Sequence, residues 1–191
     1  QYRGIKEGLP EGVILFFRLG DFYEMFFEDA KDAAPILDIA LTRRNGVPMC
    51  GVPFHAVDSY LSKLIKAGRK VAICDQLEDP AAAKGIVKRE GTRIVTPGTV
   101  TEDNILESKR NNFLTGVARR GNVFGLATID LSTGHFFGEE LHTVEALRDE
   151  LRRLAPSECV VPDEVYSHDA ELKDAIVSAG AMQVTKCEDW V

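Results

Sequence analysis

The segment Phe16–Phe27 brings aromatic and charged side chains together at a spacing that could do chemistry. Its sequence is FFRLGDFYEMFF, and Glu24 follows Asp21 at the spacing of a helix capping box, which predicts a helix beginning at Asp21. At about 100° per residue, Phe22 lies at the edge of the buried stripe of this helix and Glu24 lies opposite the stripe. Two interpretations stay open: a core aromatic with a capping carboxylate, or a ring and a carboxylate that project toward a ligand.

Four basic residues are possible contacts to a nucleic-acid backbone. Arg43 and Arg44 lie in a glycine-containing turn, His55 lies in a proline-rich turn, and Arg93 opens a short apolar run. Such side chains position proteins on phosphates. A solvated basic loop explains the two arginines equally well, and a lone histidine in such a turn is more often structural.

An enzyme site would have to be built from scattered carboxylates. The chain contains no glycine-rich phosphate loop, dinucleotide fingerprint, nucleophile elbow or paired-histidine metal motif. Asp130, in the run Asp-Leu-Ser-Thr-Gly, could bind a metal as an early-strand aspartate does in RNase H-like nucleases and phosphotransferases. Glu139, Glu140 and Asp163 are the other candidates, but none has a diagnostic spacing. We therefore expect no catalytic residues, no metal site and no enzyme in these 191 residues.

Charge is distributed unevenly along the chain. The formal net charge is −7, yet residues 1–98 hold 14 Lys and Arg against 13 Asp and Glu, while residues 99–191 hold 9 against 17. The near-neutral charge of the first half neither supports nor excludes binding to DNA, but it indicates that tight binding would need help from elsewhere. The four cysteines show no metal-binding spacing and are expected to be free thiols. The absence of a signal sequence and of a long apolar run predicts a cytoplasmic protein with no membrane contact, and the abrupt ends suggest a fragment.

The hydrophobic pattern predicts two α/β units. The first has strands at 13–17, 71–75 and 93–96, helices from Asp21 to about Pro35 and at 57–67, and an irregular stretch at 47–55. The second has a three-stranded meander at 113–118, 123–131 and 134–140. It continues with a helix at 144–154, a strand at 158–161, a helix at 169–178 and a strand at 182–185. That order is the order of an RNase H-like fold, and we place the boundary in residues 99–111, between units 1–98 and 112–191.

Four motifs in sequence resemble the mismatch-recognition domain of bacterial MutS proteins. They are GDFYEMF at 20–26, LDIALTRR at 37–44, PMCGVPFH at 48–55 and RIVTPGT at 93–99. The runs NNFL at 111–114 and IDLSTG at 129–134 resemble the start of the MutS connector domain, which here appears truncated. The resemblance covers essentially the whole chain. It implies an α/β fold in which a mixed-sheet mismatch-recognition domain precedes a partial RNase H-like connector.

The resemblance also implies the roles of Phe22 and Glu24. Phe22 corresponds to the family's intercalating phenylalanine, and Glu24 to the glutamate that contacts the displaced base. A wedge entering from the minor groove opens a base step at a cost of a few kcal/mol, which is smallest where pairing is already defective. Stacking returns roughly 1–3 kcal/mol and tolerates any base. A carboxylate near phosphates is repelled unless a base offers it a hydrogen-bond donor or it becomes protonated, so Glu24 would penalise intact duplex.

The expected partners follow from the same resemblance. They are mismatched duplex DNA, the protein MutL bound through the connector, and a second copy bound through C-terminal domains absent here. ATP and Mg²⁺ would act in the full-length family member, and we expect no cofactor in this chain. Two other functions stay open: a metal-dependent nuclease or phosphotransferase centred on Asp130, and a protein interaction module alone.

Overall fold

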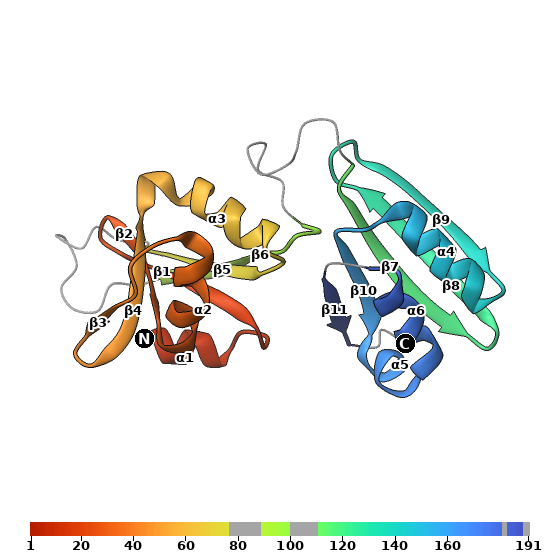
Figure 1. Ribbon diagram of the computed structural model, residues 1–191, viewed down its shortest axis with the longest axis horizontal. Helices are drawn as coiled ribbons and strands as arrows, with labels where there is room; N and C mark the ends of the chain where they lie inside the picture. The colour runs from red at the N-terminus through yellow and green to blue at the C-terminus, as the bar shows by residue number, and fades with distance from the viewer. Residues whose placement is uncertain (77–88, 100–110, 181–182, 189–191) are drawn as a thin grey trace. The chain divides into compact units, whose positions relative to one another are not determined.

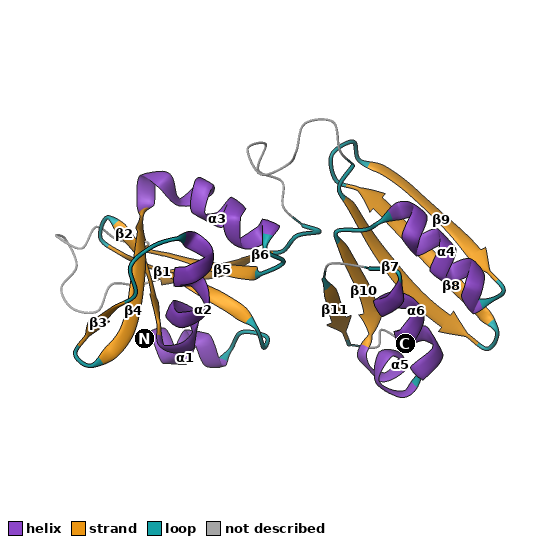
Figure 2. Cartoon of the chain, viewed as in Figure 1, coloured by secondary structure: helices purple, strands orange, loops and turns teal. Residues whose placement is uncertain are grey.

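The computed structural model describes residues 1–76, 89–99, 111–180 and 183–188, and the chain divides into the compact units Gln1–Thr96 and Pro97–Val191 (Figure 1). Each unit combines helices with one mixed β-sheet (Figure 2), which confirms the predicted α/β class. Within the described ranges, no helix is both long enough and apolar enough to cross a membrane. The predicted linker, 99–111, falls mostly on residues outside those ranges, so the predicted bounds stay a prediction.

The sheet of the first unit has the strand order β3-β4-β2-β1-β5-β6. Strands β1 and β5 are parallel, and the other neighbours are antiparallel. The strands are β1 (Val13–Leu19), β2 (Phe22–Phe26), β3 (Thr42–Arg44), β4 (Val47–Pro53), β5 (Lys70–Gln76) and β6 (Arg89–Val95). The helices are α1 (Tyr2–Glu7), α2 (Phe27–Leu37), the short 3-10 turn η1 (Phe54–Ala56) and α3 (Val57–Lys66).

Helices pack on both faces of this sheet. The pleat sends alternate side chains of β1 to opposite faces. Leu15 and Phe17 form a cluster with Tyr2 and Ile5 of α1. The opposite face, which carries Met25 and Cys50, receives α2, whose Ala30 carbonyl accepts a hydrogen bond from the Cys50 thiol. The Lys63 ammonium of α3 donates to the carbonyl of Leu37, which joins the two helices.

The prediction of a helix from Asp21 is wrong, because residues 22–26 form strand β2. Gly20, with φ 59°, makes the two-residue turn that pairs Leu19 with Phe22, and glycine favours such a hairpin turn. Side chains along β2 then alternate between exposed or half-buried and fully buried, as in a strand with one buried face. Phe22 and Glu24 therefore share a face, whereas the predicted helix separates them. Helix α2 starts only at Phe27 and ends two residues after Pro35.

The stretch predicted to be irregular is a regular hairpin of β3 and β4. Asn45 and Gly46, with φ 52° and 81°, form the two-residue turn between Arg44 and Val47. Positive φ at both positions is typical of the type I′ turn, for which Asn-Gly is the preferred sequence. Strand β4 then pairs with β2 from Phe22 to Phe26. The hairpin therefore places the Arg43–Arg44 pair on the same sheet as Glu24.

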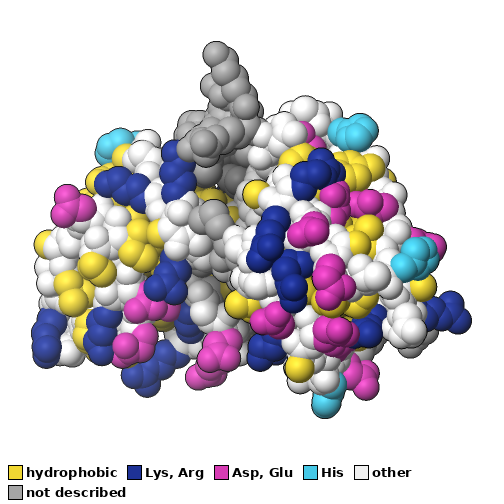
Figure 3. Space-filling view, turned by 45° about the vertical axis from the view of Figure 1, so that its right-hand side comes forward, with side chains coloured by type: hydrophobic (Ala, Val, Ile, Leu, Met, Phe, Trp, Pro, Cys, Tyr) yellow, Lys and Arg dark blue, Asp and Glu magenta, His cyan; other side chains and the backbone are white. Residues whose placement is uncertain are grey.

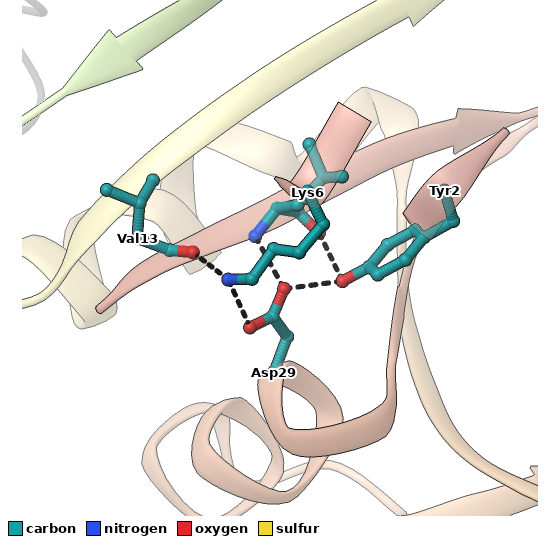
Figure 4. Close-up of polar contacts among 5 residues, drawn as sticks. Tyr2, Lys6, Val13 and Asp29 are labelled. Atoms are coloured by element: carbon teal, nitrogen blue, oxygen red, sulfur yellow. Dashed lines mark hydrogen bonds and ion pairs between the residues drawn. The ribbon is translucent and has the colours of Figure 1, made fainter. Parts of the chain in front are cut away.

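A buried carboxylate, Asp29, fastens α1 and α2 to β1 (Figure 4). Strand β2 pairs with β1 only from Phe17 to Leu19, and the N–H of Leu15 instead donates to Asp29 Oδ2 at 3.1 Å. The hydroxyl of Tyr2 donates to the same oxygen at 2.5 Å, and Lys6 Nζ lies 2.7 Å from Oδ1. Lys6 also donates to the carbonyl of Val13. Burial, followed by the hydrogen bond to Asp29, raises the pKa of Tyr2 far above its ordinary value, so the hydroxyl stays a donor.

The second unit has a five-stranded sheet with the order β11-β10-β7-β8-β9. Strands β7 (Phe113–Arg120), β8 (Val123–Asp130) and β9 (His135–Leu141) form the predicted antiparallel meander. Strands β10 (Glu158–Pro162) and β11 (Val184–Cys187) extend it in parallel beside β7. Helix α4 (Val144–Leu154) and helix α6 (Ala170–Ser178) lie as predicted, with a further short helix, α5 (Asp163–His168), between β10 and α6.

One face of this second sheet is packed against helices. Its core joins Val117, Leu126 and Cys159 of the strands to Leu147 of α4 and Leu172 of α6. On β10, the carboxylate of Glu158 is buried, and its Oε2 accepts a hydrogen bond of 3.0 Å from the N–H of Gly98. A Cβ at Gly98 would lie 2.4 Å from the Cβ of Glu158, so only glycine fits there. Residue 98 thus packs with the second unit.

Candidate nucleic-acid interface

Phe22 lies at the tip of the β1–β2 hairpin. It stands opposite Leu19 of β1 and Pro53 of β4, and 48% of its surface is exposed. The two flanking strands hold its backbone on both sides. The backbone of Phe22 is therefore fixed at the end of the sheet, and its apolar ring is half exposed.

Glu24 follows two residues later on the same face, and its carboxylate pairs with Arg44. Nη1 of Arg44 lies 3.0 Å from Oε2 and 3.4 Å from Oε1 of Glu24. The side chain of Glu24 is only 14% exposed, whereas that of Arg44 is 57% exposed. Gly51 stands opposite Glu24 on β4 and presents no side chain, and a Cβ there would already lie 3.6 Å from Cγ of Glu24. The glycine leaves the path between the carboxylate and Arg44 open.

An open groove lies on this face of the first unit. Its volume is about 630 Å³. Phe17, Leu19, Phe26, Phe27 and Val47 supply apolar walls, and Tyr2, Arg3, Arg44 and Asn45 add polar groups. The guanidinium carbon of Arg3 lies 4.6 Å from the centre of the Phe27 ring. The groove is thus mainly apolar, with two arginines, Arg3 and Arg44, in its lining.

The four basic residues proposed from the sequence do not gather at one place. Arg44 joins Glu24, but Arg43 alternates to the other face of β3, opposite Pro48. Arg93 stands opposite Ile73, on the sheet face away from Glu24, and His55 lies exposed in η1. On the surface visible in Figure 3, basic and acidic side chains are interspersed rather than gathered into one basic strip.

A second aromatic group at the hairpin was missed by the sequence reasoning. The guanidinium carbon of Arg18 lies 3.3 Å from the centre of the Phe54 ring, which is 45% exposed. The N–H of Phe54 donates to the carbonyl of Asp21 at 2.8 Å, which ties η1 to the hairpin turn. The ring centre of Tyr23 lies 6.0 Å from that of Phe54. These contacts join residues more than 30 positions apart, so only the aromatic character of Phe54 could have suggested them.

Tyr23 anchors β2 from the buried face. Its hydroxyl donates to the carboxylate of Asp75 on β5, two strands away. Burial and this hydrogen bond raise the pKa of Tyr23 well above its ordinary value. The residue between Phe22 and Glu24 is therefore fixed on the opposite face of the sheet.

Asp130, the centre of the enzyme hypothesis, is the acceptor of a tight turn. Its Oδ1 accepts hydrogen bonds from the N–H groups of Asn112 and Ser132, at 3.1 and 3.0 Å, and from the Ser132 hydroxyl at 2.7 Å. Its Oδ2 accepts one from the Thr133 hydroxyl at 2.9 Å. Burial by itself would raise the pKa of Asp130, but these hydrogen bonds outweigh it and lower the pKa. The carboxylate is thus occupied by protein donors.

The other candidate carboxylates do not converge on Asp130. Burial and the neighbouring carboxylate of Glu150 raise the pKa of Glu139, and Asp163 pairs with Lys186 at 2.8 Å. Glu140 projects from the opposite side of β9 to Glu139. Within the described parts of the chain, no group of three or more His, Cys, Asp or Glu residues could hold a metal ion.

Comparison with known proteins gives matches along the whole chain. Residues 1–104 match the family model described as MutS domain I, and residues 112–190 match MutS domain II. The DNA mismatch repair protein MutS of Acetivibrio thermocellus is 48% identical over 99% of this chain and 22% of its own length. The proteins of the same name from Pelotomaculum thermopropionicum and Desulfitobacterium hafniense are 53% and 55% identical, over 85% and 86% of the chain and 20% and 19% of their own lengths.

Proposed function

Because the chain belongs to the MutS family of DNA mismatch repair proteins, we propose that its first unit recognises mispaired or unpaired bases in duplex DNA. The chain spans about a fifth of the length of these relatives. We therefore propose, rather than infer from the similarity alone, that it shares in the activity of a whole MutS protein. The observation that carries it is the half-exposed ring of Phe22 at the tip of a hairpin.

In this proposal Phe22 is a wedge that enters a base step from the minor groove. Opening a step costs a few kcal/mol, and a mispaired step opens at the lowest cost. Stacking of the ring on the exposed base returns about 1–3 kcal/mol whatever the base is. The backbone of Phe22, held by strands on both sides, supports this role, because little backbone freedom remains to be lost on binding.

Glu24 supplies discrimination. A displaced base can donate a hydrogen bond to its carboxylate, which compensates for the repulsion between the carboxylate and the DNA phosphates. In an intact duplex the phosphates repel the carboxylate and no base donates such a hydrogen bond. Its place on the same face as Phe22 supports the assignment, since the wedge and the carboxylate then meet the same stretch of DNA.

Backbone contacts are proposed for Arg43, Arg44, His55 and Arg93. Their scatter over both faces of the sheet suggests that few of them act at once. With a nearly neutral first unit and few phosphate contacts, the affinity of the chain alone should be low and should depend only weakly on salt concentration.

Further partners and cofactors are proposed from family membership. They are MutL, bound through the second unit, and a second MutS copy, bound through domains not contained in these residues. The chain has no glycine-rich phosphate loop, so ATP and Mg²⁺ do not fit its residues and would act in other parts of the protein. The function proposed for these 191 residues is binding without catalysis, in the cytoplasm.

The test compares Phe22→Ala with the matched variant Phe54→Ala. Both remove a similarly exposed ring near the same hairpin, but only Phe22 is assigned the wedge role. Affinities for mismatched and matched duplexes are measured at low salt, with the full-length protein that carries this sequence and with the 191-residue chain. Phe22→Ala should abolish the preference for mismatched DNA in the full-length protein, with Phe54→Ala retaining it. Unchanged discrimination in Phe22→Ala refutes the proposal.

A further inference from the structure

We propose that Arg44 is a positioning residue that sets mismatch specificity by holding the carboxylate of Glu24 beside Phe22. The inference rests on the proposed role of Glu24 and adds to it a residue 20 positions away in the sequence. It assigns Arg44 a task in addition to the backbone contact proposed above.

The sheet register places the three residues on one face. Arg44 stands opposite Val47, and Glu24 and Phe22 stand opposite Gly51 and Pro53 of the same strand, β4. Residues 47, 51 and 53 are separated by even numbers of positions, so they point to the same side. The neighbouring Arg43, opposite Pro48, points to the other side. Of this arginine pair, only Arg44 can reach Glu24.

The contact leaves Glu24 able to bind a base. A single nitrogen, Nη1 of Arg44, approaches both carboxylate oxygens, at 3.0 and 3.4 Å. A carboxylate has about four acceptor positions, so lone pairs remain for a base donor. Glu24 can therefore stay paired with Arg44 while it accepts a second hydrogen bond.

The pair also reduces the repulsion between Glu24 and DNA. The carboxylate is mostly covered and the guanidinium mostly exposed, so the positive group is the one that an approaching phosphate meets. An ion pair with one exposed partner adds little to folding stability. We expect the ion pair instead to orient the carboxylate of Glu24 and to offset its negative charge.

A double-mutant cycle tests the inference in the full-length protein that carries this sequence. Arg44→Gln is made alone and together with Glu24→Gln, and the affinities for mismatched and matched duplexes are measured over a range of salt concentrations. In the Glu24 background, Arg44→Gln should lower the ratio of mismatched to matched affinity by about two- to fivefold, the size of one exposed ion pair. With Gln at position 24 it should leave the ratio unchanged. Arg44→Lys should restore part of the ratio, because an ammonium group can still pair with Glu24.

Controls distinguish the positioning role of Arg44 from a structural role and from a phosphate contact. Lys31→Gln, which removes an exposed ammonium group paired with Glu28, should leave the ratio unchanged, and the melting temperature of Arg44→Gln should match that of the unsubstituted protein. A phosphate contact as the sole role of Arg44 would instead weaken both duplexes equally, whatever stands at position 24, and reduce the salt slope by about 0.9. That result, or an unchanged ratio, overturns the inference while Phe22→Ala still tests the proposed function. A protein that binds both duplexes equally before substitution refutes the proposed function and the inference with it.

Discussion

The ring of Phe22 and the carboxylate of Glu24 project from the same face of β2, separated by the buried Tyr23. Two strand positions fix their separation along the strand at about 7 Å. The hydroxyl of Tyr23 is bonded to Asp75 on the opposite face. Strand β2 therefore cannot rotate about its own axis without breaking this hydrogen bond. The spacing between the proposed wedge and the proposed base contact is thus a property of the fold.

Glu24→Ala should tighten binding to matched duplex. The substitution removes a negative charge near the phosphates and leaves Arg44 without its carboxylate partner. We expect a gain of about fivefold, which corresponds to about 1 kcal/mol for one charge pair in a watery environment. Titration of a labelled matched duplex at fixed salt measures it. Glu28→Ala is the control, since Glu28 is an exposed glutamate paired with Lys31 in the same unit. Equal affinity of Glu24→Ala and the unsubstituted protein for matched DNA would contradict the discriminating role.

Asp130→Asn should destabilise the second unit at neutral pH. An amide cannot accept all the hydrogen bonds that the carboxylate receives from Asn112, Ser132 and Thr133, and an unsatisfied buried donor costs about 1–3 kcal/mol. Folding lowers the pKa of Asp130, so its carboxylate stabilises the folded state. This contribution to the free energy of unfolding is complete at pH values above the ordinary aspartate pKa of about 3.9, and it is lost as the pH falls through the lowered pKa. Urea unfolding at neutral and acidic pH should therefore show a difference between the two proteins that shrinks in acid.

The same variant addresses the enzyme alternative. The chain, incubated with Mg²⁺ or Mn²⁺ and nucleic acid, should leave the nucleic acid intact. Metal-dependent cleavage that disappears in Asp130→Asn would show that the carboxylate is catalytic. Asp149→Asn, at an exposed position of α4, is the control for both measurements.

Cys187 should react with thiol reagents before the other three cysteines. All four are thiols rather than disulfides, and Cys187 is the one among them that is partly exposed. Burial raises the pKa of Cys50 to about 11 and that of Cys159 to about 12, so neither forms the reactive thiolate at neutral pH. Labelling followed by peptide mapping should show one fast site in the native chain and four in urea. Cys187→Ser should remove the fast site, and rapid labelling of Cys50 or Cys159 would show that its surroundings open.

The second unit was the easier one to predict. The side chains of β8 alternate between buried and more exposed positions, glycines lie in the turns before and after it, and Thr143 caps α4 by accepting a hydrogen bond from the N–H of Ala146. Local signals of this kind need no knowledge of distant partners. The Asn45–Gly46 turn was an equally local signal, and the β3–β4 hairpin was missed because the prolines of β4 suggested an irregular path.

The error at Phe22–Phe26 has a different origin. Asp21 and Glu24 match a capping box, and the aromatic residues recur at helical intervals, but pairing with both β1 and β4 outweighs these local preferences. Phe22 and Glu24 could be predicted as site residues because they lie in the motif GDFYEMF, which resembles that of the MutS family. The ion pair of Glu24 with Arg44 joins strands separated by the whole of α2, so its formation depends on tertiary structure that no local pattern encodes.

The buried carboxylate of Asp29 limits how far the first unit can be shortened. A chain that begins after Lys6 keeps every strand but leaves this anion in the interior without the hydroxyl of Tyr2 and the ammonium of Lys6. Losing the partner of a buried charge costs about 3–5 kcal/mol, a large part of the stability of an ordinary domain. Any shortened version of the first unit must therefore retain its first six residues.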